Sequence, residues 1–129
     1  MQKILAIDYG TKRLGLAVSS GHLAEPFLVL ANDEQLFKRL QSIIEQEGVK
    51  QIVIGLSENE MADLTREFAQ ELETIVPKIP IEFADETLSS RAVMDKLGER
   101  GIKSVGKSKP IDHFAAALIL ENWLEQQED

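Results

Sequence analysis

Short apolar runs bounded by turn residues predict five β-strands, at residues 3–8, 14–19, 26–30, 51–55 and 79–83. The first three strands are joined by short connections, the segment 9–13 and a turn at Gly21 and His22. Connections this short favour antiparallel neighbours, because parallel strands need a long crossover. The chain is therefore expected to begin with a three-stranded antiparallel meander.

Longer segments carry apolar residues at helical spacing and predict the helices. Four helices are expected: from an Asn32–Gln35 capping box to a stop at Gly48, and at about 61–76, 88–97 and 110–125. Pro77 ends the second helix and Pro110 opens the last, while residues 99–109 form a loop. The later strands alternate with helices and should join the sheet in parallel through right-handed crossovers. The predicted class is α/β, with a mixed five-stranded sheet flanked by helices on both faces.

The composition further limits the class of protein that this chain can be. A chain of 129 residues is expected to form a single domain over 1–129, with one hydrophobic core. It has no Cys, which excludes a disulfide framework and thiolate chemistry. No apolar run approaches the ~18 residues of a membrane span, and a strand begins at once with no signal-peptide pattern. A cytoplasmic protein without membrane contacts is expected.

The net charge of −8 argues against a general nucleic-acid binder, but the charges are distributed unevenly. Residues 1–20 hold three basic side chains against Asp8, and residues 91–109 hold six basic against two acidic. The second basic stretch includes Lys107 and Lys109. Both basic stretches lie beside candidate acidic residues, although varying charge on helix surfaces is an equally ordinary explanation.

Asp8 is the most informative acid, because it ends the apolar run Ile4-Leu5-Ala6-Ile7. A carboxylate carried to the rim of a core strand is costly to leave unpaired. It is also a rigidly held oxygen ligand of the kind that a hard cation requires. The sequence therefore predicts that Asp8 has a function beyond structure.

Further acids stand at the ends of predicted elements, Asp85 and Glu86 after the fifth strand and Asp112 in the first turn of the last helix. Acids gathered at one edge repel one another unless a divalent ion joins them. Two such ions can activate water and stabilise the leaving oxygen of a phosphodiester. Each acid also has a structural explanation: Asp112 suits a helix dipole, Asp85 can cap a helix, and Glu86 can be a solvated loop residue.

The turn after Asp8 suits a phosphate group. Backbone N–H groups at Gly10 and Thr11, together with the side chains of Lys12 and Arg13, could hold it. His113 beside Asp112 could act as an acid or base, although a lone His on a helix more often packs or faces solvent. His22 receives no role, and Trp123 and Phe114 are expected in the core.

Four segments in order together resemble the YqgF family, also called RuvX, over nearly the whole chain. They are 8–17 (DYGTKRLGLA), 52–56 (IVIGL), 83–90 (FADETLSS) and 109–120 (KPIDHFAAALIL). The resemblance implies an RNase H-like fold and a nuclease dependent on Mg²⁺ or Mn²⁺. The family is described as a Holliday junction resolvase and as the nuclease that matures the 5′ end of pre-16S ribosomal RNA. By resemblance, Asp8 and Asp112 would be metal ligands, and Glu86 a third ligand or water-orienting group.

Two segments depart from the family pattern. Thr87 stands where the family usually has Arg, which removes a cation near the expected phosphate path. The segment 57–63 (SENEMAD) is acidic where the family has a Gly-rich loop, and negative charge disfavours a passing polyanion.

These departures leave three hypotheses. The first is a metal-dependent endonuclease on structured RNA or DNA, with the ribosomal RNA precursor preferred over Holliday junctions and a monomer or weak homodimer as the unit. The second is a non-catalytic binding module on the same fold, acting in ribosome assembly or transcription. The third is a nucleotide-phosphate binder, since the turn resembles the first phosphate loop of sugar kinases and actin-like ATPases.

Overall fold

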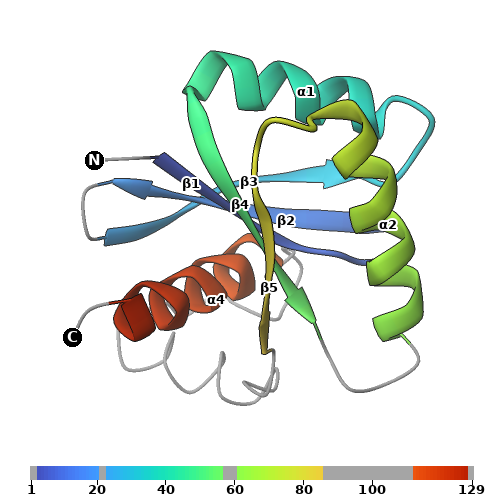
Figure 1. Ribbon diagram of the computed structural model, residues 1–129. Helices are drawn as coiled ribbons and strands as arrows, with labels where there is room; N and C mark the ends of the chain where they lie inside the picture. The colour runs from blue at the N-terminus through green and yellow to red at the C-terminus, as the bar shows by residue number, and fades with distance from the viewer. Residues whose placement is uncertain (1–2, 21–22, 57–60, 86–111, 128–129) are drawn as a thin grey trace.

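The computed structural model of the chain describes residues 3–20, 23–56, 61–85 and 112–127. A five-stranded sheet runs through the centre, with strand order β3-β2-β1-β4-β5 (Figure 1). The strands are β1 (Lys3–Asp8), β2 (Arg13–Ser20), β3 (Leu23–Ala31), β4 (Val49–Leu56) and β5 (Ile81–Asp85). The helices are α1 (Leu36–Glu47), α2 (Met61–Ile75) and α4 (Asp112–Gln127).

The sheet is mixed, as the sequence predicts. β1 pairs antiparallel with β2, and β2 antiparallel with β3, whereas β4 pairs parallel with both β1 and β5. The carboxyl ends of parallel strands meet at the same edge of a sheet. Asp8, the last residue of β1, and Asp85, the last residue of β5, therefore end at the same edge.

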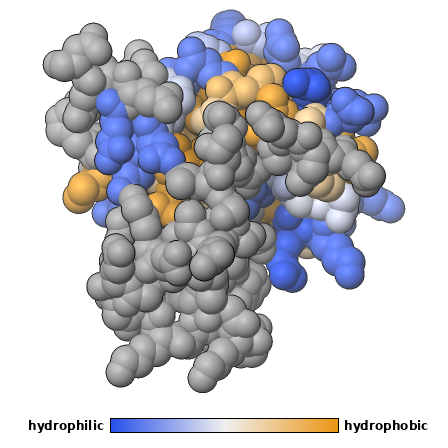
Figure 2. Space-filling model, turned by 90° about the horizontal axis from the view of Figure 1, so that it is seen from below, coloured by the Kyte–Doolittle hydropathy of each residue, from blue (hydrophilic) through white to orange (hydrophobic). Residues whose placement is uncertain are grey.

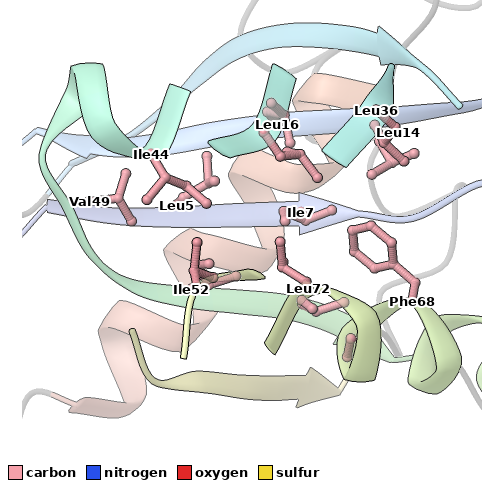
Figure 3. Close-up of a cluster of buried hydrophobic side chains, with 14 of the residues drawn as sticks. Leu5, Ile7, Leu14, Leu16, Leu36, Ile44, Val49, Ile52, Phe68 and Leu72 are labelled. Atoms are coloured by element: carbon pink, nitrogen blue, oxygen red, sulfur yellow. The ribbon is translucent and has the colours of Figure 1, made fainter. Parts of the chain in front are cut away.

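Helices α1 and α2 cover one face of the sheet (Figure 1). Every second residue of β1 faces them: Leu5 and Ile7 are fully buried in one cluster with residues of α1 and α2. Figure 3 shows this cluster, in which Leu36 and Ile44 of α1 and Leu72 of α2 point toward the sheet. Burying each such side chain stabilises the fold by about 1.5–3 kcal/mol.

Helix α4 covers the opposite face. The residues of β1 that alternate with the first set, Ile4 and Ala6, are buried there with Trp123 and other α4 side chains. Small residues dominate the contact, with Ala6 and Ala17 on the sheet and Ala116 and Ala117 on the helix. Small side chains let the backbone of a helix approach a sheet closely, so the position of α4 is tightly constrained.

Several predicted boundaries are corrected. β5 begins at Ile81 rather than Ile79, because residues 76–80 still form the turn that ends α2. In that turn the Ile79 N–H donates to the Val76 carbonyl at 3.1 Å, and Pro80 contributes only its carbonyl to Ile52. β3 begins at Leu23 rather than residue 26, since Pro26 is tolerated in an edge strand.

The predicted capping box at the start of α1 is wrong. Gln35 is the residue that precedes the helix, and it makes no side-chain capping bond. The Asp33 carboxylate instead accepts the Gln35 backbone N–H at 2.9 Å. The stop at Gly48 is confirmed: its φ is 65°, and its N–H reaches the carbonyls of Glu45 and Ile44.

The predicted helix at 88–97, the loop at 99–109 and Pro110 lie outside the described residues. Where the structure is described, α4 extends to Gln127, two residues beyond its predicted end. Among the described residues, no helix is both long enough and apolar enough to span a membrane.

Candidate functional site

Asp8 lies at the carboxyl end of β1, on the sheet face that α4 covers. Side chains along a strand alternate between faces, and Ile4 and Ala6 belong to the α4 cluster while Leu5 and Ile7 face α1 and α2. Asp8 continues the series of Ile4 and Ala6, and it is half-buried. Its backbone is paired in register with Gly15 of β2. A carboxylate in this place is held by a paired strand and not by a loop.

Among the described strand residues, small ones lie beside Asp8 on this face. Gly15 lies directly opposite it on β2, and Gly55 follows Ile54, the parallel partner of Ile7 on β4. Ala84 pairs with Gly55 on the next strand and packs into the α4 cluster. The described strands therefore place small residues on both sides of Asp8 at this end of the sheet.

Helix α4 starts at the edge where β1, β4 and β5 end. Asp112 is its first residue. Near the other end of the helix, Trp123 donates from Nε1 to the Glu82 carboxylate at 3.0 Å, and Glu82 lies at the start of β5. The helix thus runs antiparallel to β1, with its amino end toward the strand ends (Figure 1). The backbones of Asp8 and Asp112 are brought to the same end of the same face, while the Asp112 side chain lies outside what the structure describes.

The turn after Asp8 is anchored on the opposite face by Tyr9. The Tyr9 ring packs on Phe68 of α2 with ring centroids 4.7 Å apart, and Phe68 stacks on Phe37 of α1 at 5.6 Å. Aromatic pairs in such arrangements add about 0.5–1.5 kcal/mol beyond their buried area. Because the Tyr9 ring is held in this way, the backbone of Asp8, the residue before it, is also held in place.

A second anchor holds the middle of the same turn. Asn32, just after β3, donates from its side-chain amide to the Gly10 carbonyl at 2.8 Å. Its backbone N–H donates to the Lys12 carbonyl at 2.9 Å. A Cβ added to Gly10 would lie 2.5 Å from the Arg13 carbonyl oxygen, so the turn is closed too tightly for a side chain there.

The side chains of Thr11, Lys12 and Arg13 are exposed. Arg13 begins β2 opposite Ala31, and the two residues before it form the tip of the turn. The turn predicted to hold a phosphate thus presents two cations to solvent beside the end of β1. A cationic, backbone-rich turn of this kind favours anions.

Figure 2 looks onto the side of the molecule where β4 and β5 end, and its upper part shows an apolar patch bordered by hydrophilic side chains. Asp85 is the last residue of β5 and pairs with Leu56 of β4.

Several residues of the predicted site are not described. Glu86, Lys107, Lys109 and His22 lie outside the described residues, as do the side chains of Asp85, His113 and Phe114. Trp123 is in the core, as predicted, at 8% exposure.

The described residues contain no group of three His, Asp or Glu side chains that could hold a metal ion. Asp8 is the one predicted ligand whose side chain the structure describes. Its chemistry fits the expected ion, because Mg²⁺ and Mn²⁺ bind carboxylate oxygens and gain from a ligand on a rigid strand.

The sequence pattern did not reveal Asn32 or Tyr9 as parts of this site. Asn32 is 22 residues from Gly10 in the chain, and the pattern suggested only a helix cap for it. Tyr9 stood in the turn motif without an assigned partner. One signal was available for Asn32. The predicted strand 26–30 pairs with the strand that follows the turn, and this places Asn32, just after it, near the turn.

The sequence profile described as "RuvX: Holliday junction resolvase" matches residues 2–126. A protein of Maridesulfovibrio salexigens named "Putative pre-16S rRNA nuclease" is 42% identical, over 95% of this chain and 97% of its own length. A protein of the same name from Sulfurihydrogenibium sp. is 35% identical, over 98% of this chain and 92% of its own.

Solved structures support the fold. RuvC of T. thermophilus, solved in complex with a Holliday junction, superposes with a TM-score of 0.62 at 16% identity, covering 98% of this chain and 96% of RuvC. Archaeoglobus fulgidus Pelota gives a TM-score of 0.53 at 12% identity, over 97% of this chain and 35% of Pelota. The RuvC likeness supports the predicted RNase H-like fold.

Proposed function

Since this chain belongs to the RuvX family, as its motifs predict, we propose that it is a divalent-metal-dependent endonuclease that matures the 5′ end of pre-16S ribosomal RNA. Its curated relatives carry the name of pre-16S rRNA nuclease and match it over nearly their full length. The observation that carries the proposal is the placement of Asp8. It ends a buried strand on the α4 face, at the edge where α4 begins with Asp112. Such a nuclease would work in the cytoplasm, where the precursor is made.

Asp8 and Asp112 would be metal ligands in this proposal, with Glu86 as the third ligand or as the group that orients water. Bound Mg²⁺ or Mn²⁺ would activate a water and stabilise the leaving oxygen of the phosphodiester. The protein's part is to hold the carboxylates in place and to position the phosphate.

The phosphate would be held by the turn from Gly10 to Arg13. The exposed side chains of Lys12 and Arg13 supply positive charge, and the backbone amides supply directed donors. Lys107 and Lys109, in the basic stretch before Asp112, would contact the flanking backbone of the nucleic acid. Thr87 and the acidic segment 57–63 would narrow the range of substrates that pass this edge.

A DNA four-way junction is the second candidate substrate, favoured by the description of the matching family profile. Both substrates present phosphodiesters to the same carboxylates, so the chemistry does not separate them. The acidic segment 57–63 would repel either polyanion, so the names of the curated relatives are what favour the ribosomal RNA precursor.

The test is cleavage of a 16S RNA fragment with a 5′ extension, and of a four-way DNA junction, by the native chain and by Asp8→Asn. The native chain should cleave the RNA in Mg²⁺ or Mn²⁺ and should stop when EDTA is added. Asp8→Asn should cleave at least about a thousandfold more slowly, since it removes charge stabilisation of several kcal/mol.

Glu45→Gln is the matched control, because it removes one negative charge on an exposed residue at the far end of α1. This control should cleave at the native rate. Native activity in Asp8→Asn, or no cleavage of either substrate by the native chain in either metal, would overturn the proposal. The second result would leave the non-catalytic binding module as the better account.

A further inference from the structure

The side chain of Asn32 ties the end of β3 to the turn that follows Asp8. Its amide donates to the Gly10 carbonyl at 2.8 Å, across 22 residues of chain, and its backbone N–H donates to the Lys12 carbonyl at 2.9 Å. Two bonds from one residue to two carbonyls of a four-residue turn fix the planes of two peptide groups. The Asn32 side chain is half-buried, so water competes only partly for the hydrogen bond between its amide and the Gly10 carbonyl.

This arrangement determines the direction of one backbone amide. The Gly10 carbonyl and the Thr11 N–H belong to the same peptide group, and none of the described peptide bonds is cis. In a trans peptide these two groups point in opposite directions. Because the carbonyl is drawn to Asn32, the Thr11 N–H is directed away from Asn32 and from the end of β3.

The amide so directed is available to a ligand. Among the described residues, no backbone carbonyl accepts a hydrogen bond from the N–H of Gly10, Thr11 or Lys12. Thr11 and Lys12 are exposed, so these donors lie at the surface of the turn. The turn is also closed tightly at Gly10, because the Arg13 carbonyl oxygen lies 2.5 Å from where a Cβ would stand.

The start of α1 does not require the Asn32 side chain. Asp33 accepts the Gln35 N–H and also pairs with Arg39 at 3.4 Å, so the local capping role is filled by the next residue. Within the described residues, the Asn32 side-chain amide bonds to the turn and not to α1. Its length and its donor group match a carbonyl at this distance, and an aspartate of the same shape would offer an oxygen to an oxygen.

We propose that Asn32 is a positioning residue for substrate binding, which aims the Thr11 amide at a phosphate of the nucleic-acid backbone. The inference rests on the proposed nuclease function and adds to it a residue outside the carboxylate set. Asn32 touches neither the substrate nor the metal; it acts through the Gly10–Thr11 peptide. Losing it frees that peptide to rotate, and the phosphate then loses one directed donor.

The experiment compares Asn32→Ala and Asn32→Asp with the native chain in cleavage of the 5′-extended RNA. Asn122→Asp adds the same charge near the far end of α4 and serves as the control. Both Asn32 variants keep the backbone bond to Lys12 and should remain folded in thermal unfolding. Their KM should rise about tenfold for Asn32→Ala and further for Asn32→Asp, with kcat within about twofold of native.

A purely structural tie gives a different result, namely a lower unfolding temperature with unchanged KM and kcat well below that temperature. This result would overturn the inference, and so would an equal rise of KM in Asn122→Asp. A second measurement, RNA binding by fluorescence anisotropy in the Asp8→Asn background, separates the two proposals. If the native chain fails to cleave but Asn32→Ala weakens RNA binding about tenfold, the nuclease function is wrong and the positioning role stands.

Discussion

The carboxylate of Asp8 is held by its neighbours on both sides along the chain. Ile7 before it is fully buried, and the ring of Tyr9 after it packs on Phe68. The sequence alone indicated that Asp8 ends a core strand, because four apolar residues precede it. It did not indicate that Tyr9 and Asn32 both hold the turn, since both contacts join residues far apart in the chain.

Gly10→Ala tests the tightness of that turn. The new Cβ meets the Arg13 carbonyl, so the turn must open, and the unfolding free energy should fall by about 1–3 kcal/mol. The KM for RNA should also rise, because the amides of the turn are displaced. Urea denaturation and cleavage kinetics measure the two effects.

Gly48→Ala is the matched control. Gly48 has a φ of 65° but nothing within 4 Å of an added Cβ, so the substitution costs about 1 kcal/mol of backbone strain and leaves KM unchanged. A native KM in Gly10→Ala would contradict the role given to the turn.

At the scale of elements, the sequence predicted all five strands and the three helices that the structure describes. Alternating and helical patterns determine these because each element buries one side against the sheet or the core. The patterns did not determine element ends, such as the start of β5, where Pro80 still belongs to the turn after α2. They also did not indicate that Glu82 and Trp123 meet, because the two lie 41 residues apart.

The bond between Glu82 and Trp123 should help to hold α4 in the orientation that brings Asp112 to the strand ends. Glu82→Ala should lower the unfolding free energy by about 1 kcal/mol, since this hydrogen bond is only part-buried and water can partly replace the exposed carboxylate. Trp123→Phe removes the donor, and the double variant should cost less than the sum of the two single changes.

Glu82→Gln is the control, because its amide oxygen still accepts the Trp123 N–H. Its unfolding free energy should stay close to native in urea denaturation. Strictly additive losses in the double variant would show that the two residues are not coupled.

At the scale of the whole molecule, a net charge of −8 must be reconciled with a polyanionic substrate. The uneven distribution of charge along the chain offers a reason, and the structure supports part of it. Lys12 and Arg13 are exposed beside the end of β1. The rest of that prediction, with Glu86, Lys107 and Lys109, concerns residues outside the described part and stays a prediction.

RNA binding should therefore depend steeply on salt. If the turn and the second basic stretch neutralise about three phosphates, affinity should fall about twentyfold between 0.05 and 0.2 M salt. Anisotropy with the Asp8→Asn chain measures this without cleavage. Lys12→Ala should make the salt slope shallower by about 0.7, whereas Lys50→Ala, at the start of β4, should leave it unchanged. Equal slopes in all three chains would contradict binding at the turn.

The most direct test of the account is a calorimetric titration of Mn²⁺ into the native chain, Asp8→Asn and Glu45→Gln. Each titration is run alone and with the mature 5′-end RNA, a product that supplies phosphates without turnover. Mn²⁺ should bind the native chain and Glu45→Gln, most strongly with RNA present, and should bind Asp8→Asn at least tenfold more weakly. Equal Mn²⁺ affinity in the native chain and Asp8→Asn under both conditions would contradict a metal site at Asp8.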